Sequence, residues 1–121
     1  MVADAPSAAE TAAVLSALAG VRRGDPVAAV GCDRVTAACL AASSGRPLLD
    51  GEPGAARVVV VARARDVRQA LRLLAPGGRI VTIAADAGAA ERVATSLGLQ
   101  LRHVEPLGAQ VAWSGVRALA P

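Results

Sequence analysis

Large aromatic side chains are almost missing from this chain of 121 residues, which has one Trp and neither Phe nor Tyr. Hydrophobic residues still make up 54% of the sequence, so its core must be built from Val, Leu, Ile and Ala. Proteins that bind single-stranded nucleic acid stack bases on aromatic rings beside basic groups. The shortage of rings therefore argues against nucleic acid as a partner, although the net charge is +3.

Lysine, long apolar runs and a cysteine framework are missing as well. All 13 basic residues are arginine, which we interpret as the codon bias of a GC-rich bacterial genome. No run approaches the roughly 18 uninterrupted apolar residues of a membrane span, and the first residues do not resemble a signal peptide. We therefore predict a cytoplasmic protein. Two cysteines, Cys32 and Cys39, are too few for a disulfide framework or a zinc cluster, and we expect buried, reduced thiols and no metal site.

The apolar pattern alternates helices with strands. Ser7 and Glu10 form a capping box that begins a helix, and Gly20 ends it. The expected elements are helices over 7–20, 34–43 (capped by Asp33), 66–75 (capped by Asp66 and ended by Pro76, Gly77 and Gly78) and 88–97, strands over 27–31, 57–62 and 79–85, a loop over 43–54, and two last strands around a turn at 106–109. This order predicts one domain over 1–121 with an α/β, Rossmann-like three-layer sandwich, whose mostly parallel sheet ends in a C-terminal antiparallel hairpin.

The second half of the chain resembles a known family. The segment ALRLLAPGGRIVTIA (70–84), followed by a helix and a hairpin, is similar to the end of the class I S-adenosylmethionine-dependent methyltransferase fold. The last residues, GVRALAP (115–121), are similar to methyltransferases of corrinoid biosynthesis. Medium-chain dehydrogenases contain similar short segments, but their nucleotide domains do not usually end in such a hairpin. The resemblance implies S-adenosylmethionine as the cofactor.

The first half departs from that family at the cofactor loop. The family has an acid and then three glycines at alternate positions. Aligned on Gly31, the acid falls on Ala29, and the other two glycines fall on Asp33 and Val35. Asp33 would project toward the cofactor, and Val35 resists a positive φ. The stretch is then either a plain strand-to-helix turn or an altered site. If the site survives, the resemblance implies cofactor contacts from Gly31, Cys32, Asp33, Asp50, Ala62 and Arg63.

The second strand of the family is also in doubt. Asp50 and Glu52 fall near the spacing of the acid that the family uses for the ribose hydroxyls, but the next strand already begins at Arg57. A parallel crossover needs about a dozen residues or more. We therefore predict that the second strand is vestigial or absent and that the third is missing. The sheet should have about five strands, in the order first, 57–62, 79–85, last and penultimate, with the first strand at an edge.

Other candidate residues have both a plain and a functional interpretation. His103 is either an exposed strand residue or a catalytic group, but no nucleophile and acid can be assembled around it, so we predict no catalytic residue. Trp113 is either a core residue or an interface anchor. Four arginines form either a solvated helix face or a site for an anionic ligand: Arg63, Arg65, Arg68 and Arg72.

Three functions remain open at this point. An apolar edge strand invites pairing with another chain, which favours a non-catalytic methyltransferase-like protein that acts as a homodimer or docks on a larger protein partner. The alternative is a minimal S-adenosylmethionine-dependent methyltransferase with an altered loop. A third hypothesis, a nicotinamide-nucleotide module, lacks the glycines that such a site requires.

Overall fold

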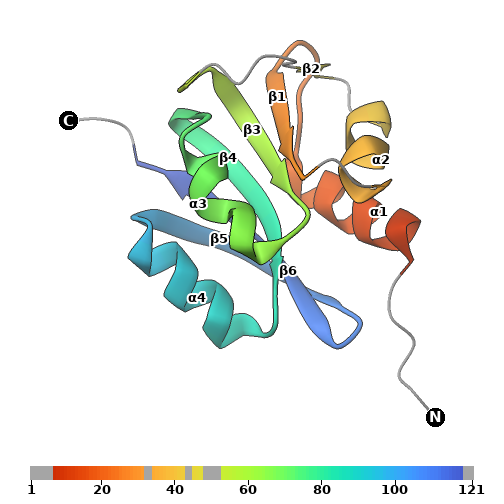
Figure 1. Ribbon diagram of the computed structural model, residues 1–121, viewed down its shortest axis with the longest axis vertical. Coiled ribbons are helices and arrows are strands. Elements are labelled where there is room, and N and C mark those ends of the chain that lie inside the picture. Colours follow the sequence, from red (N-terminus) through yellow and green to blue (C-terminus); the bar gives the residue numbers. More distant parts are fainter. Residues whose placement is uncertain (1–6, 32–33, 43–44, 48–52, 119–121) are drawn as a thin grey trace.

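A single six-stranded sheet organises the molecule (Figure 1). The computed structural model describes residues 7–31, 34–42, 45–47 and 53–118. Across the sheet, the strands are β2 (Arg46–Pro47), β1 (Pro26–Val30), β3 (Ala56–Val61), β4 (Leu74–Ala84), β6 (Gln110–Arg117) and β5 (Leu99–Leu107). The first four are parallel, and β6 runs antiparallel to both β4 and β5. The predicted strand order and the C-terminal hairpin are confirmed.

Helices cover both faces of this sheet, which confirms the three-layer sandwich. Helices α1 (Ala8–Ala19) and α2 (Arg34–Ala42) lie on one face, and α3 (Val67–Leu71) and α4 (Ala87–Ser96) lie on the other. The alternation of side chains along each strand divides the core between the two faces. Val58 and Val60 of β3 pack toward α1 and α2, whereas Val59 and Val61 pack toward α3 and α4. Both sides of β3 are therefore buried.

The ends of α1 and α4 follow from local side-chain chemistry. The hydroxyl of Ser7 accepts a hydrogen bond from the Glu10 backbone N–H at 3.1 Å, as the capping box predicts. At the other end of α1, Gly20 adopts the left-handed conformation with φ of 56°. Asp86 caps the start of α4, although the sequence did not predict it as a cap, and its carboxylate accepts a hydrogen bond from the Ala89 N–H at 2.8 Å.

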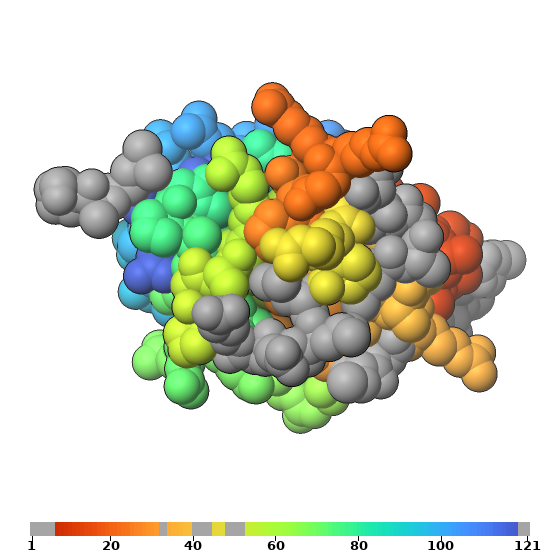
Figure 2. All heavy atoms as spheres, turned by 90° about the horizontal axis from the view of Figure 1, so that it is seen from above, coloured from red at the N-terminus to blue at the C-terminus, as the bar shows by residue number. Residues whose placement is uncertain are grey.

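The prediction of about five strands, with the first at the edge, needs a correction. The sheet has a sixth strand, β2, which is only two residues long and pairs with Pro26 and Val27 of β1. Figure 2 shows β2 (yellow) at the surface beside the segment that leads into β1 (orange). In the described part of the chain no strand lies beyond β2, so the second strand of the fold is vestigial. It shields the start of β1, which is therefore not the edge strand along its whole length.

The segment 66–75 also differs from the prediction. Asp66 gives no side-chain cap, a short 3-10 turn (Ala64–Asp66) precedes α3, and α3 ends at Leu71. The predicted helix terminator, Pro76-Gly77-Gly78, lies inside β4, where the pairing with β3 passes from Ala56–Leu74 directly to Val58–Arg79. A β-carbon on Gly78 would approach the Ala75 carbonyl oxygen to 2.8 Å, so this bulge requires glycine.

Trp113 is a core residue, as the plain interpretation proposed. It lies on β6, is 1% exposed and packs on the face that α3 and α4 cover. Cys39 is buried under α1, where its thiol contacts the Ala12 carbonyl oxygen at 3.5 Å. Cys32 lies outside the described residues. In the segments the structure describes, no helix is long and apolar enough to cross a membrane.

Candidate functional site

The carboxyl end of β1 makes a sharp turn at Gly31. Its φ is +92°, a conformation that residues with a β-carbon rarely adopt. The Gly31 carbonyl oxygen accepts a hydrogen bond from the buried Thr36 hydroxyl of α2 at 2.7 Å, which ties the turn to the helix that follows. Gly31 therefore keeps the sharp turn that the resemblance implies for the first glycine of the family's loop.

Two charged side chains from the end of β3 lie against this turn. The guanidinium Nε of Arg63 is 3.1 Å from Oδ2 of Asp66, so the two form an ion pair. A β-carbon placed on Gly31 would lie 3.5 Å from that Asp66 oxygen and 3.6 Å from Arg63 Nη2. The Arg63–Asp66 pair thus fills the space directly beside the Gly31 backbone. The sequence places the two residues three positions apart, but it predicts Asp66 as a helix cap and not as a partner of Arg63.

The remaining predicted contact residues are not brought together in the same way. Ala62 is 7% exposed and directly follows β3, so it is buried. Cys32, Asp33 and Asp50 lie outside the described residues, as does Glu52. The structure therefore places Arg63 beside Gly31, buries Ala62, and leaves the other three contacts as predictions.

Three further arginines of the described residues follow the end of β3. Arg65, Arg68 and Arg72 are exposed, in agreement with a solvated face. The described residues contain no group of His, Cys, Asp and Glu side chains that could hold a metal ion.

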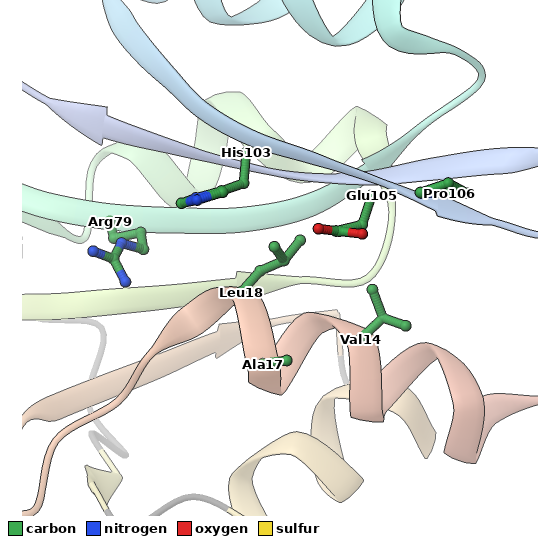
Figure 3. A pocket seen from close by; sticks show the side chains of 7 residues that line it. All are labelled: Val14, Ala17, Leu18, Arg79, His103, Glu105 and Pro106. Carbon is green, nitrogen blue, oxygen red and sulfur yellow. The ribbon is translucent and has the colours of Figure 1, made fainter.

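His103 is an exposed residue of β5, as its plain interpretation states, but it does not stand alone. It lines a groove of about 430 Å³ on the face that carries α1 (Figure 3). Arg79 of β4 and Glu105 of β5 line the same groove, opposite Val14, Ala17 and Leu18 of α1. Sequence analysis missed this groove, because its residues are close only when β4, β5 and α1 are assembled.

The comparison with solved structures agrees with the fold described above. No model of a known protein family matches the sequence, and no curated protein matches it. Among solved structures, the chain is similar to geranyl diphosphate methyltransferase in complex with S-adenosylmethionine, with a TM-score of 0.67 and 14% identity over 90% of this chain and 86% of that one. It is similar to an S-adenosylmethionine-dependent O-methyltransferase of Thermotoga maritima, with a TM-score of 0.64 and 9% identity over 91% of this chain and 65% of that one.

A third similar structure is precorrin-6Y C5,15-methyltransferase from Geobacter metallireducens, with a TM-score of 0.60 and 12% identity over 88% of this chain and 87% of that one. These identities are too low to carry an activity or a substrate, so the likeness concerns architecture. With the sheet order and the C-terminal hairpin, it shows that this chain has the fold of class I S-adenosylmethionine-dependent methyltransferases.

Proposed function

We propose that this protein is a non-catalytic relative of the class I methyltransferases that acts by associating with another protein chain. The observation that carries the proposal is the Arg63–Asp66 ion pair against Gly31. Ligands of open α/β sheets bind at the carboxyl ends of the strands, and the family's glycines keep that place free of side chains. Here two charged side chains occupy it and neutralise one another.

The chemistry at the end of β1 also fits S-adenosylmethionine poorly. The family resemblance places a hydrogen-bond-accepting acid at position 29, and this chain has the methyl group of Ala29 there. A cofactor that approached the Gly31 backbone would have to displace Arg63 and leave the partly buried Asp66 without its partner. We therefore assign no reaction of this cofactor to the protein.

Association is supported by the vestigial second strand. Strand β2 pairs with only Pro26 and Val27, so among the described residues the outer edge of Ala28–Val30 has no strand partner. Unpaired strand edges are templates for pairing with another chain. A second copy or a larger protein would cover this edge, and the cytoplasm is the compartment that we expect for the complex.

The alternative is a minimal methyltransferase with an altered loop. It is favoured by one observation, namely that Gly31 keeps the positive φ of a cofactor turn. In this alternative the Arg63 side chain moves aside when the cofactor enters.

Calorimetric titration with S-adenosylmethionine and S-adenosylhomocysteine, together with sedimentation of the purified protein, separates the two functions. We expect no saturable heat and a mass above that of the 12.0 kDa monomer, or a partner recovered with the tagged chain. Replacing Arg63→Ala should not create binding, and Arg65→Ala is the matched control on an exposed neighbour. One-to-one binding of either nucleoside would overturn the non-catalytic assignment. A strict monomer without a recovered partner would overturn the association.

A further inference from the structure

The groove between α1 and β5 combines an apolar wall with charged ends. Val14 and Leu18 of α1 form one side, and they are half-buried rather than covered by another element. Figure 3 shows the His103 ring extending toward Arg79 and the Glu105 carboxylate pointing into the space above Leu18. The volume of about 430 Å³ lies within the range of pockets that hold small molecules.

The charged groups of this groove lack ionic partners. Within the described residues, neither Arg79 nor Glu105 forms an ion pair, and His103 makes no side-chain hydrogen bond. Arg79 uses one nitrogen, Nη1, to donate to the Ala19 carbonyl oxygen at 2.9 Å. Its Nε is buried and has no hydrogen-bond acceptor among the described residues. A buried donor without an acceptor is costly, and the remaining guanidinium nitrogen, Nη2, makes no hydrogen bond in that part of the chain.

The strand registers fix the order of these groups along the groove. Arg79 is level with Val116 of β6, and His103 and Glu105 are level with Ser114 and Ala112 of the same strand. The order along the groove is therefore Arg79, His103, Glu105. Residues two apart on a strand share a face and are separated by about 7 Å. Along the strand direction both donors therefore precede the carboxylate, and His103 lies about 7 Å from Glu105. Across the sheet, β6 lies between the strands of Arg79 and His103, so their backbones are two strand spacings of about 5 Å apart and only their side chains can approach a shared ligand group.

We propose that this groove binds a small zwitterion with its two charges on opposite ends of an aliphatic chain. The carboxylate of the ligand accepts hydrogen bonds from Arg79 and His103, and its ammonium group pairs with Glu105. The methylene chain packs on Leu18 and Val14. The site lies on a face of the sheet, apart from the turn at Gly31, so it does not depend on whether a nucleoside binds there.

The probe is ε-aminocaproate, which carries a carboxylate and an ammonium group at the two ends of a flexible methylene chain. The protein has a single histidine, so its imidazole proton resonance in an NMR titration reports on this groove alone, and the Leu18 methyl resonances report on the opposite wall. We expect saturable shifts of both. Caproate and hexylamine, which each lack one charge, should bind more weakly by about three- to tenfold.

Substitutions at two exposed positions of β5 test which charged end of the ligand lies at which end of the groove, and they leave the buried core unchanged. Glu105→Gln should abolish the preference for ε-aminocaproate over caproate. His103→Gln should weaken the binding of both of these carboxylates, and in that variant binding is followed at the Leu18 methyl resonances. Arg102→Gln is the matched control, because Arg102 is exposed on the same strand but does not line the groove. It should leave every affinity unchanged.

Three results would overturn the proposal. One is the absence of a saturable shift at His103 and Leu18 with any of the three probes. Another is equal loss of binding in Arg102→Gln and His103→Gln, which would indicate a diffuse charge effect. The third is a shift that follows protein concentration instead of ligand, which would show that a second copy of the chain covers the groove.

Discussion

Two polar regions of this molecule differ in whether their charged side chains have partners. At the end of β1, Arg63 and Asp66 pair with each other and Thr36 bonds to the Gly31 carbonyl oxygen. In the groove beside α1, the charged side chains have no ionic partner among the described residues, and the buried Nε of Arg79 has no acceptor. The first region satisfies its own polar groups, whereas the second does not.

This difference indicates where a bound ligand would stabilise the protein. Entry of a ligand beside Gly31 must first break interactions that already exist, whereas a ligand in the groove meets charged side chains that have no ionic partner among the described residues. The fold alone would direct attention to the first region, since that is where open α/β sheets bind their ligands. The chemistry of the side chains directs it to the second.

Removing the buried side chain of α1 that packs beneath the groove should have the largest effect on stability. Leu15 of α1 is fully buried against the sheet, so Leu15→Ala should lower the free energy of unfolding by about 2–5 kcal/mol. Denaturant unfolding measures this loss. Leu18→Ala removes a half-buried side chain from the wall of the groove. It should lower the free energy of unfolding by less than Leu15→Ala does, and it should weaken the binding of ε-aminocaproate. Equal losses for the two variants would contradict the placement of α1.

Arg79 should matter more to stability than Arg63. Arg79→Ala leaves the Ala19 carbonyl oxygen at the end of α1 without its donor, which costs about 1–3 kcal/mol. Thermal and denaturant unfolding of both arginine variants provides the comparison. A larger loss for Arg63→Ala would reverse our ranking of the two regions.

Two glycines can separate backbone strain from displacement of Arg79. Gly20 and Gly24 both have positive φ, so alanine at either should cost about 1 kcal/mol. A β-carbon on Gly20 would also lie 2.7 Å from Arg79 Nη1, whereas nothing lies within 4 Å of one on Gly24. Gly20→Ala should therefore be the more destabilising and should also weaken ε-aminocaproate. Unfolding curves and the NMR titration would contradict this if the two variants behaved alike.

The smallest effect is expected at the ion pair. The Arg63 side chain is 51% exposed, so Arg63→Ala should change the free energy of unfolding by less than about 1 kcal/mol. The loss should also shrink at high salt, because exposed charges are screened. Unfolding at low and high salt measures both. A loss that salt leaves unchanged would mean that the Arg63 side chain contributes packing instead of charge.

The arrangement of the elements could be predicted from the sequence where local signals were strong. Ser7 and Gly20 bounded α1, the run of valines marked β3, and the shortness of the chain between 43 and 57 predicted a second strand that is vestigial or absent. The helix predicted over 66–75 exists only over Val67–Leu71, because the apolar spacing of Val67, Ala70 and Leu74 suits a helix although Leu74 already belongs to β4. Tertiary pairing with Ala56 overrode the local pattern there.

The groove could not be predicted in the same way. His103 and Arg79 come from strands separated by β6 in the sheet, and Leu18 comes from the first helix. The bulge at Leu101–His103 also shifts the register of β5, so simple alternation does not tell which face His103 occupies. Only the assembled sheet brings a guanidinium group, an imidazole and a carboxylate to one apolar surface.

The most direct test of this account is one NMR titration series that follows Gly31 and His103 in the same labelled protein. S-adenosylhomocysteine and ε-aminocaproate are added in separate experiments. We predict that S-adenosylhomocysteine leaves the Gly31 amide unmoved and that ε-aminocaproate shifts the His103 resonances to saturation. A saturable shift of Gly31 with S-adenosylhomocysteine, together with an unmoved His103, would contradict it.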